Sequence, residues 1–259
     1  MKFISWNVNG IRAWYKKDKE LKTFSWLLKQ KPDFICLQEI KAEEDQLPHD
    51  LREVPDYFSF FESSREKKGY SGVAIYTKHK PKKVENGLGI KRLDQQGRFL
   101  ALYYDKFVVI NCYFPNGGMG GDAFKYKLDY YNAFLKYILD LKKKGYKVVF
   151  VGDINVAHEE IDIARPKENK DSIGFLPVER DWLTSVIKNG FVDTWRIKNP
   201  KKVEYSWWDM KTRARDRNVG WRIDYIFVSK TLEKHINKTK IHGDVFGSDH
   251  CPISLDLEI

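Results

Sequence analysis

The segment KVVFVGDINVAHEEID, residues 147–162, constrains the fold and function of this 259-residue chain more than any other. Residues 148–151 form a β-branched and aromatic run with apolar residues on both faces, which is typical of a strand buried inside a sheet. The run stops at Gly152, and Asp153 and Asn155 then project to the same side of an extended chain. Either these two residues form a capped Asx-turn, or a rigid strand presents a carboxylate and a carboxamide together as a site.

The composition predicts a folded domain with a substantial core. Apolar residues make up 42% of the sequence, and it contains no Pro/Gly/Ser-rich linker, repeat or low-complexity tract. We therefore expect a single domain spanning residues 1–259. The chain enters strand-like sequence without a signal peptide, and no stretch approaches the roughly eighteen apolar residues that a bilayer span needs. These features predict an intracellular protein of the cytoplasm or nucleoid, monomeric and without a membrane partner.

The formal net charge is +10, and two explanations for it are open. Clustered lysines and arginines bind polyanions because they neutralise phosphates and release counterions. Runs such as 78–83 and 142–144 are equally typical of ordinary solvated faces. The cysteines Cys36, Cys112 and Cys251 are widely spaced and lie in or beside apolar runs, which favours reduced buried thiols over a disulfide or a zinc site.

Polar side chains close two predicted strands near the N-terminus. Alternation over residues 3–8 predicts a strand that brings Asn7 and Asn9 together at its end. The apolar run 34–38 ends on Glu39. Burying such a carboxylate costs several kcal/mol unless a metal or a cation compensates, so Glu39 is a candidate site residue.

Later strands repeat this pattern. A strand over 107–112 leads into Tyr113 and Asn116, and Asp224 opens a strand over 225–228. Asp249 and His250 precede the final strand. For that Asp-His pair, metal ligation, acid-base chemistry and a hydrogen-bonded turn are all open interpretations. The other elements expected are a turn at 10–12, a helix ending before Pro32, a strand at 73–77, helices at about 124–143 and 177–190, a long surface loop at 207–218, and a final strand at 253–259.

Many acidic and hydrogen-bonding side chains of this chain lie at the end of a predicted strand or in the adjoining turn. We therefore expect them to converge on one cleft. Carboxylate and amide oxygens without a cysteine cluster suit Mg²⁺, with Mn²⁺ as a substitute, better than zinc. Such a site can activate water and stabilise a phosphoryl transition state. The residues concerned are Asn7, Glu39, Tyr113, Asn116, Asp153, Asn155, Asp224, Asp249 and His250.

Aromatic and basic residues alternate in the predicted loop 207–218. Rings stack on bases or sugars and guanidinium groups pair with phosphates, so this loop is a candidate nucleic-acid surface. The alternative is that Trp207 or Trp208 belongs to the core, which for any single tryptophan is the more common outcome. Tyr70 lies in a basic, glycine-hinged loop over 65–72, where it either contacts a ligand or fills an ordinary interface.

Seven motifs run through nearly the whole chain, from Ser5 to Ile253: SWNVNGIRAW, LQEIK, GYSGVAIY, YFPNGG, GDINVAHEEID, NVGWRIDY and GSDHCPI. In this combination the chain resembles the exonuclease III family of class II apurinic/apyrimidinic (AP) endonucleases. The resemblance implies the α/β fold of that family, a four-layer sandwich of two packed mixed β-sheets flanked by helices. It also implies Mg²⁺-dependent incision of double-stranded DNA 5′ to an abasic site, leaving a 3′-OH, with 3′-phosphodiesterase and 3′→5′ exonuclease activity.

The resemblance implies a role for each catalytic candidate. Asp153 would orient or deprotonate the attacking water, and His250, paired with Asp224, would hold a non-bridging phosphate oxygen. A Tyr113 phenolate is the alternative base; we favour Asp153 because a carboxylate is ordinarily ionised at neutral pH. Tyr113 with Asn116 would support the phosphate or the leaving group, and Asn155 would bind the phosphate. Glu39 is implied as the principal metal ligand, and the other candidates for the metal shell are Asn7, Asn9, Asp153, Asn155 and Asp249.

The resemblance also implies DNA contacts. Trp207, Trp221 and Ile223 match an apolar pocket for the flipped-out abasic sugar, from which a normal nucleotide is excluded because its base has no room. Asn9 stands where some members have a metal-shell aspartate. Met119 and Lys211 stand where some members insert an arginine and a methionine into the duplex. The remaining candidates for DNA contact are Arg12, Lys17, Gly69, Tyr70 and Asn169.

Two other functions compete with this one. Another branch of the same superfamily would be a phosphoinositide phosphatase or a general nuclease, against which the tryptophan-lined segment 218–222 and the basic charge argue. A DNA-binding module without catalysis is the alternative from a different class, although every acid that the chemistry needs is present.

Overall fold

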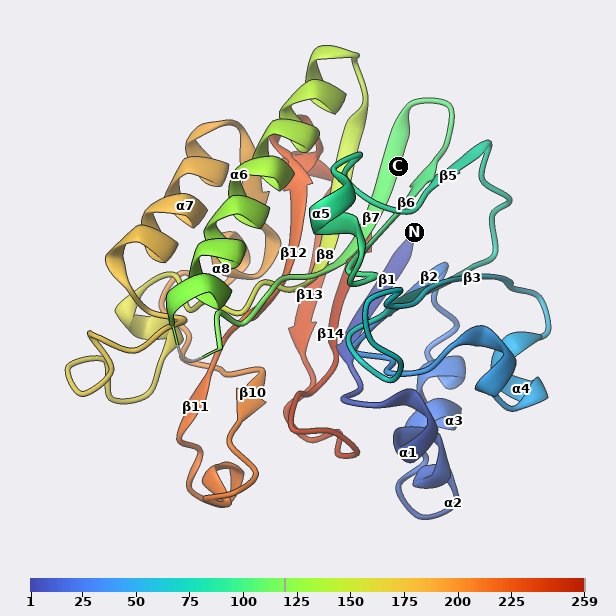
Figure 1. The fold of residues 1–259 in the computed structure, drawn as a ribbon, viewed down its shortest axis with the longest axis horizontal. Helices are drawn as coiled ribbons and strands as arrows, with labels where there is room; N and C mark the ends of the chain where they lie inside the picture. The colour runs from blue at the N-terminus through green and yellow to red at the C-terminus, as the bar shows by residue number, and fades with distance from the viewer. Residues whose placement is uncertain (119, 259) are drawn as a thin grey trace.

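Two six-stranded β-sheets form the centre of the molecule (Figure 1). The computed structural model describes residues 1–118 and 120–258. The first sheet has the strand order β13-β14-β1-β2-β4-β3 and the second β5-β6-β7-β8-β12-β9. Both sheets are mixed, because β1 pairs with β2 and β7 with β8 in parallel while their other pairs are antiparallel. A short third pair, β10 with β11, is antiparallel.

The strands have the following bounds: β1 Lys2–Asn7, β2 Phe34–Gln38, β3 Phe58–Glu62, β4 Val73–Thr77, β5 Lys83–Glu85, β6 Phe99–Tyr103, β7 Phe107–Tyr113, β8 Lys147–Asp153, β9 Phe191–Asp193, β10 Trp207–Trp208, β11 Gly220–Trp221, β12 Asp224–Ser229, β13 Ile236–Ile241 and β14 Ile253–Leu257. The α-helices are α1 Ile11–Lys16, α2 Asp18–Leu21, α3 Thr23–Lys29, α4 His49–Arg52, α5 Lys91–Asp94, α6 Gly121–Lys143, α7 Pro177–Lys188 and α8 Thr194–Lys198. Short 3₁₀ helices are η1 Glu44–Gln46, η2 Glu160–Asp162, η3 Ala214–Arg217 and η4 Lys230–His235.

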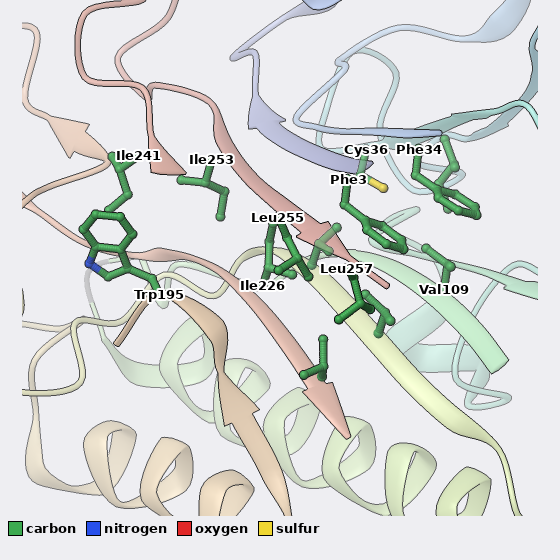
Figure 2. Packing of buried hydrophobic residues seen from close by; sticks show 14 of the residues in the cluster. Phe3, Phe34, Cys36, Val109, Trp195, Ile226, Ile241, Ile253, Leu255 and Leu257 are labelled. Carbon is green, nitrogen blue, oxygen red and sulfur yellow. The ribbon is translucent and has the colours of Figure 1, made fainter. Parts of the chain in front are cut away.

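The inner faces of the two sheets share one apolar core (Figure 2). Phe3 of β1 stacks on Phe34 of β2 with ring centroids 4.7 Å apart, and Val109 of β7 faces them from the other sheet. Leu255 of β14 and Ile226 of β12 extend the same core. Strands with both faces covered need apolar residues at successive positions, which explains the continuous run in β8.

Helices cover the outer face of each sheet. Helices α6 and α7 pack on the second sheet through a cluster that includes Phe134 and Trp182, while α1 and α3 cover the first sheet around Trp6 and Trp14. The order of layers is therefore helix, sheet, sheet, helix, as Figure 1 shows. The predicted four-layer α/β sandwich is confirmed.

Several local predictions were wrong. The turn expected at 10–12 is the start of α1, and the single helix expected before Pro32 is divided into α1, α2 and α3. The break between α2 and α3 falls at Lys22, whose φ of 54° is left-handed and cannot continue a right-handed helix. Helix α6 begins at Gly121 rather than near residue 124. The predicted loop 207–218 contains β10 and η3, and it buries Trp208 and Ala214 because that tryptophan packs into the core.

No helix in the described ranges 1–118 and 120–258 is long and apolar enough to cross a membrane. Cys36, Cys112 and Cys251 are free and buried, which confirms the prediction of reduced thiols. Ile259, the expected end of the last strand, lies outside the described residues.

Buried His242 makes the fold sensitive to acid. Its Nε2 lies 2.8 Å from Ser254 Oγ, and its ring packs edge-on against Trp26. Burial, followed by the charge of Lys240, lowers the pKa of His242 to about 4. A depressed histidine pKa means that the unfolded chain binds the proton first. The stability that neutral His242 contributes is therefore present above about pH 6.5 and lost as the pH falls towards 4.

Glutamine at position 242 can still hydrogen bond to Ser254 but does not titrate. When the pH falls from 7 to 4.5, we expect the free energy of unfolding to decrease less in His242→Gln than in the wild type, by up to about 3 kcal/mol. Urea unfolding at the two pH values measures this difference. The exposed His49→Gln serves as the control and should follow the wild type. Equal acid losses in wild type and His242→Gln would contradict the assignment.

Candidate active site

Strand ends from both sheets meet at one end of the sandwich. Tyr113 of β7 and Asp224 of β12 are both directly paired with Asp153, the last residue of β8. From the other sheet, β1 delivers Asn7 and the residue after β2 is Glu39. The cleft between them has a volume of about 480 Å³. It is lined by Glu39, Tyr113, Asn116, Asp153, Asn155, Ser172, Ile173, Gly174, Trp207, Trp221, Ile223, Asp249 and His250.

Asn7 joins the two acidic residues at the centre of the cleft. Its Nδ2 donates to Glu39 Oε1 and to Asp153 Oδ2, each at 2.9 Å. Asp153 Oδ1 accepts from the backbone N–H of Asn155 at 2.8 Å, and its Oδ2 accepts from Asn155 Nδ2 at 3.2 Å. Glu39 and Asn155 both have left-handed backbone, with φ of 52° and 58°. For glutamate this conformation is strained, and strain of this kind concentrates at functional sites.

His250 and Asp224 form a buried pair in the same cleft. His250 Nδ1 lies 2.8 Å from Asp224 Oδ2, and its Nε2 lies 3.8 Å from Asp153 Oδ2. Burial by itself lowers the pKa of this imidazole, but the charges of Asp224 and Asp153 outweigh burial and raise the pKa of His250 to about 10. The arrangement therefore favours an imidazolium at neutral pH, and a cation at this point can hold a phosphate oxygen.

The prediction that Asp153 is ionised at neutral pH was wrong for the protein groups of this cleft by themselves. Burial raises the pKa of Asp153, and the nearby carboxylates of Asp224 and Glu39 raise it further, although His250 opposes them. A further positive charge beside that of His250 must offset this cost before Asp153 can act as a base. The alternative base is less favourable still, because burial and then the charge of Glu39 raise the pKa of Tyr113 well above its usual value.

The donor set of the cleft fits a hard divalent cation. Carboxylate oxygens of Glu39 and Asp153 lie within 4.8 Å of each other and of a ring nitrogen of His250. The two carboxylates can bind a metal, whereas a protonated His250 is a donor only. Burial tends to raise the pKa of Glu39, but Lys41, the Asn7 hydrogen bond and the charge of His250 together outweigh it and lower the pKa. The Lys41 ammonium lies 2.7 Å from Glu39 Oε2 and 2.5 Å from Asn9 Oδ1, so a cationic group already compensates this carboxylate. Two carboxylates and neighbouring amide oxygens match the ligands that Mg²⁺ and Mn²⁺ use.

The other candidates for the metal shell lie just outside that group. Asp249 Oδ1 accepts from Asn9 Nδ2 at 3.0 Å, and its Oδ2 accepts from Trp207 Nε1 at 3.1 Å. Burial tends to raise the pKa of Asp249, but the charge of His250 and these hydrogen bonds outweigh it and lower the pKa. Asp249 therefore connects the acidic centre to the aromatic wall of the cleft.

Asn9→Asp adds a carboxylate beside Asp249 and Glu39. Without metal, we expect this repulsion to lower the melting temperature. With metal, the extra ligand charge should lower the Mg²⁺ concentration for half-maximal activity about three- to tenfold. A Mg²⁺ titration of activity and a thermal melt in EDTA measure the two opposite effects. The exposed Asn237→Asp is the matched control, and an unchanged Mg²⁺ requirement in Asn9→Asp would contradict the prediction.

An apolar wall completes the cleft. Trp207 and Trp221 pair across β10 and β11, with ring centroids 6.1 Å apart and planes at 90°. Ile223 is buried beneath them. Gly174 closes the other side, where a Cβ atom would lie 2.9 Å from the Trp221 ring. The structure thus brings together the three residues predicted to form this pocket.

The predicted DNA-contact residues lie mostly outside the cleft. Arg12 and Gly69 line a neighbouring groove of about 790 Å³, which reaches Lys41. Lys17 Nζ donates to the carbonyl of Gly247 at 2.8 Å, and the Tyr70 hydroxyl accepts from Arg98 Nη2 at 2.9 Å. Asn169 and Lys211 also lie outside the cleft: Asn169 hydrogen bonds within its own loop, Lys211 is exposed, and Met119 falls outside the described residues.

Sequence analysis missed several residues that shape the cleft. Lys41 lies within the quoted motif LQEIK, so its position beside Glu39 was a usable signal. Lys127 and Glu179 lie on helices far from the motifs, and both are fully buried. Lys127 precedes Tyr130 by three residues and Tyr131 by four, so it lies on the buried face of the helix. This spacing was the sequence signal for Lys127. Segment 172–174 carried no signal that we recognise.

The family profile described as the Endonuclease/Exonuclease/phosphatase family matches residues 4–250. This chain belongs to that family. It is 42% identical to an exodeoxyribonuclease of Bacillus subtilis (strain 168) over 260 residues, covering 100% of both chains. It is 39% identical to the DNA repair nuclease APEX1 of Danio rerio over 263 residues, covering 100% of this chain and 83% of that protein.

Solved structures of the endonuclease/exonuclease/phosphatase family share this fold. An AP endonuclease from Archaeoglobus fulgidus superimposes with a TM-score of 0.88 at 28% identity, covering 100% of both chains. Together with the sequence relatives, this match confirms the predicted family, the α/β sandwich and the class of enzyme, a hydrolase of the DNA repair nucleases.

Proposed function

We propose that this protein hydrolyses the phosphodiester 5′ to an abasic site in double-stranded DNA and leaves a 3′-OH, with Mg²⁺ as its cofactor and Mn²⁺ as a substitute. The proposal rests on one observation: the same cleft contains both an acidic centre and an apolar pocket. An acidic centre with a buried cationic histidine lies beside a pocket walled by two tryptophans. The first suits phosphodiester hydrolysis, and the second suits a sugar without a base.

In the proposed reaction, Asp153 accepts the proton of the attacking water while Asn7 and Asn155 orient its carboxylate. His250 donates from Nε2 to a non-bridging phosphate oxygen, and Asp224 holds the other ring nitrogen. Glu39, Asp153 and the amide oxygens around them would hold the metal. The chemistry supplied by a bound Mg²⁺ is neutralisation of phosphate charge and activation of water.

Asn155 binds the phosphate, and Tyr113 and Asn116 support the leaving 3′ oxygen from the β7 side of the cleft. Trp207, Trp221 and Ile223 receive the flipped-out sugar. Backbone phosphates on either side contact residues around the cleft, some cationic and some neutral. The proposed contacts are Arg12, Lys17, Gly69, Tyr70, Asn169 and Lys211.

The proposal includes 3′-phosphodiesterase and 3′→5′ exonuclease activity. A phosphate next to a 3′ end that binds at the same centre is also joined to a 3′ oxygen, so the same P–O bond can be hydrolysed. The name of the Bacillus relative supports this extension. We further propose that residues 1–259 act as a single domain and as a monomer, in the cytoplasm or nucleoid where the DNA substrate lies.

The test is incision of a labelled duplex with one tetrahydrofuran abasic analogue, in Mg²⁺ and in EDTA. We expect a metal-dependent cut 5′ to the analogue and none in the matched undamaged duplex. Hydrolysis of inositol phosphates, with the abasic duplex left intact, would overturn the repair function in favour of another branch of the family. Tight binding without any cut would favour a DNA-binding module.

A further inference from the structure

A buried ion pair joins the two helices behind the cleft. Lys127 of α6 and Glu179 of α7 contact each other through Nζ and Oε1, and neither side chain is exposed. Burial, which Glu179 only partly opposes, lowers the pKa of Lys127. Taking both charges out of water costs several kcal/mol per ion, so the pair must make further contacts to be tolerated.

Those contacts are to the cleft. Lys127 Nζ donates to the carbonyl oxygen of Asn155 at 2.8 Å and to that of Asn116 at 3.4 Å. With Glu179 as the third partner, all three donors of the ammonium are used. Both asparagines line the cleft beside Asp153.

Glu179 extends the same network to the opposite wall. Its Oε2 accepts from the backbone N–H of Gly174 at 2.7 Å and from that of Leu176 at 3.1 Å. Gly174 in turn lies against the Trp221 ring. One buried pair therefore touches the backbone of three separate cleft segments, those around Asn116, Asn155 and Gly174.

The pose of Asn155 depends on its backbone. The residue is held in left-handed backbone with φ of 58°, and this conformation aims Nδ2 at Asp153 Oδ2 and at the carbonyl of Phe114, 3.2 and 2.9 Å away. If Lys127 is removed, the Asn155 carbonyl loses its charged partner, and rotation of this peptide would move the amide away from Asp153.

We propose that Lys127, held by Glu179, is a positioning residue for the proposed reaction: it fixes the backbone of Asn155 and Asn116 and so sets the geometry around Asp153. The inference rests on the proposed function, since it assigns Lys127 to that reaction. The Lys127 side chain is fully buried, and it acts through the two asparagine carbonyls.

The test is the double substitution Lys127→Met with Glu179→Leu, which removes both charges at similar volume. The double variant leaves the backbone groups of Asn116, Asn155, Gly174 and Leu176 without these partners, so we expect a lower melting temperature. Kinetics are therefore measured at a temperature where circular dichroism shows the variant fully folded. We expect kcat on the abasic duplex to fall about 10- to 100-fold with KM changed less than about threefold, because a shift of about 1 Å in a catalytic group costs that much. Lys127→Arg, which keeps a charged donor, should retain more activity than Lys127→Met.

Lys142→Met is the matched control. Lys142 lies on the same helix and also donates to a main-chain carbonyl, that of Asn189, but at the other end of α6. This variant should keep the wild-type kcat.

A crystal structure of the double variant gives a readout independent of activity. We expect Asn155 to leave left-handed backbone and the contact from its Nδ2 to Asp153 to be lost. An unmoved Asn155, or a kcat within about threefold of wild type, would overturn the proposal. If the wild type itself does not cut abasic DNA, the proposed function fails, while the position of Asn155 in the variant still decides the role of the pair.

Discussion

Replacing Asp153 with asparagine is expected to lower kcat for incision of abasic duplex by about 10³-fold or more, which is typical of the loss of a catalytic base. The carboxylate is buried and accepts hydrogen bonds from Asn7 and Asn155 on both oxygens. An amide of the same shape must turn an N–H₂ group towards one of these donors, and it cannot accept a proton from water. The substitution also removes the negative charge that faces His250.

Binding should survive in this variant. Loss of a negative charge beside the phosphate position leaves DNA affinity unchanged or higher, so gel-shift Kd on the abasic duplex should be within about threefold of wild type. Asp256→Asn is the control, since this carboxylate lies on β14, is not among the residues that line the cleft, and pairs with Lys2 at 3.9 Å. A kcat for Asp153→Asn within tenfold of wild type would rule out Asp153 as the base.

His250→Asn should lower kcat by about 10²- to 10³-fold, because preorganised donors at the developing phosphate charge contribute on this scale. The imidazole is buried, and Asp224 fixes Nδ1 so that Nε2 faces the cleft. Asparagine retains a donor on a shorter side chain but carries no charge. Single-turnover cleavage measures the chemical step directly, and a variant that cleaves as fast as wild type would contradict the role.

The pH profile gives a second test of the same pair. Because the pKa of His250 is raised to about 10, the imidazolium persists through neutral pH and is lost as the pH rises towards that value. Activity that needs the cation should therefore decline on the alkaline side. Asp224→Asn removes the largest favourable charge, so its alkaline decline should begin at lower pH than in the wild type. A profile that is identical in both proteins would show that His250 does not act as a cation.

The strand pattern made much of this site predictable from sequence. Buried strands that end on Asn7, Glu39, Tyr113 and Asp153 were visible as apolar runs followed by polar residues, and all four lie in or border the cleft. The period of two in a strand determines which side chains share a face, so this inference needed no knowledge of the fold. The motifs around them supported the family, which the comparisons confirmed.

Local backbone was harder to predict. The first helical segment is interrupted at Lys22 because this residue has left-handed backbone. A lysine side chain does not favour that conformation, so the sequence did not indicate it. The burial of Trp208 within a segment expected to be a loop depends on the core that it meets. In both cases tertiary contacts outweigh propensity, which is a weak local preference.

The sequence by itself determined the fold class, the family and the residue types of the cleft, because apolar periodicity and the motifs are properties of the chain alone. Only the tertiary structure decided the electrostatics. The pKa of Asp153 is raised because the fold buries its carboxylate and because β12 brings Asp224 beside it. Lys127 and Glu179 likewise become site residues only when α6 and α7 pack together behind the cleft. Charge interactions depend on distance and burial, and the order of residues along a chain specifies neither.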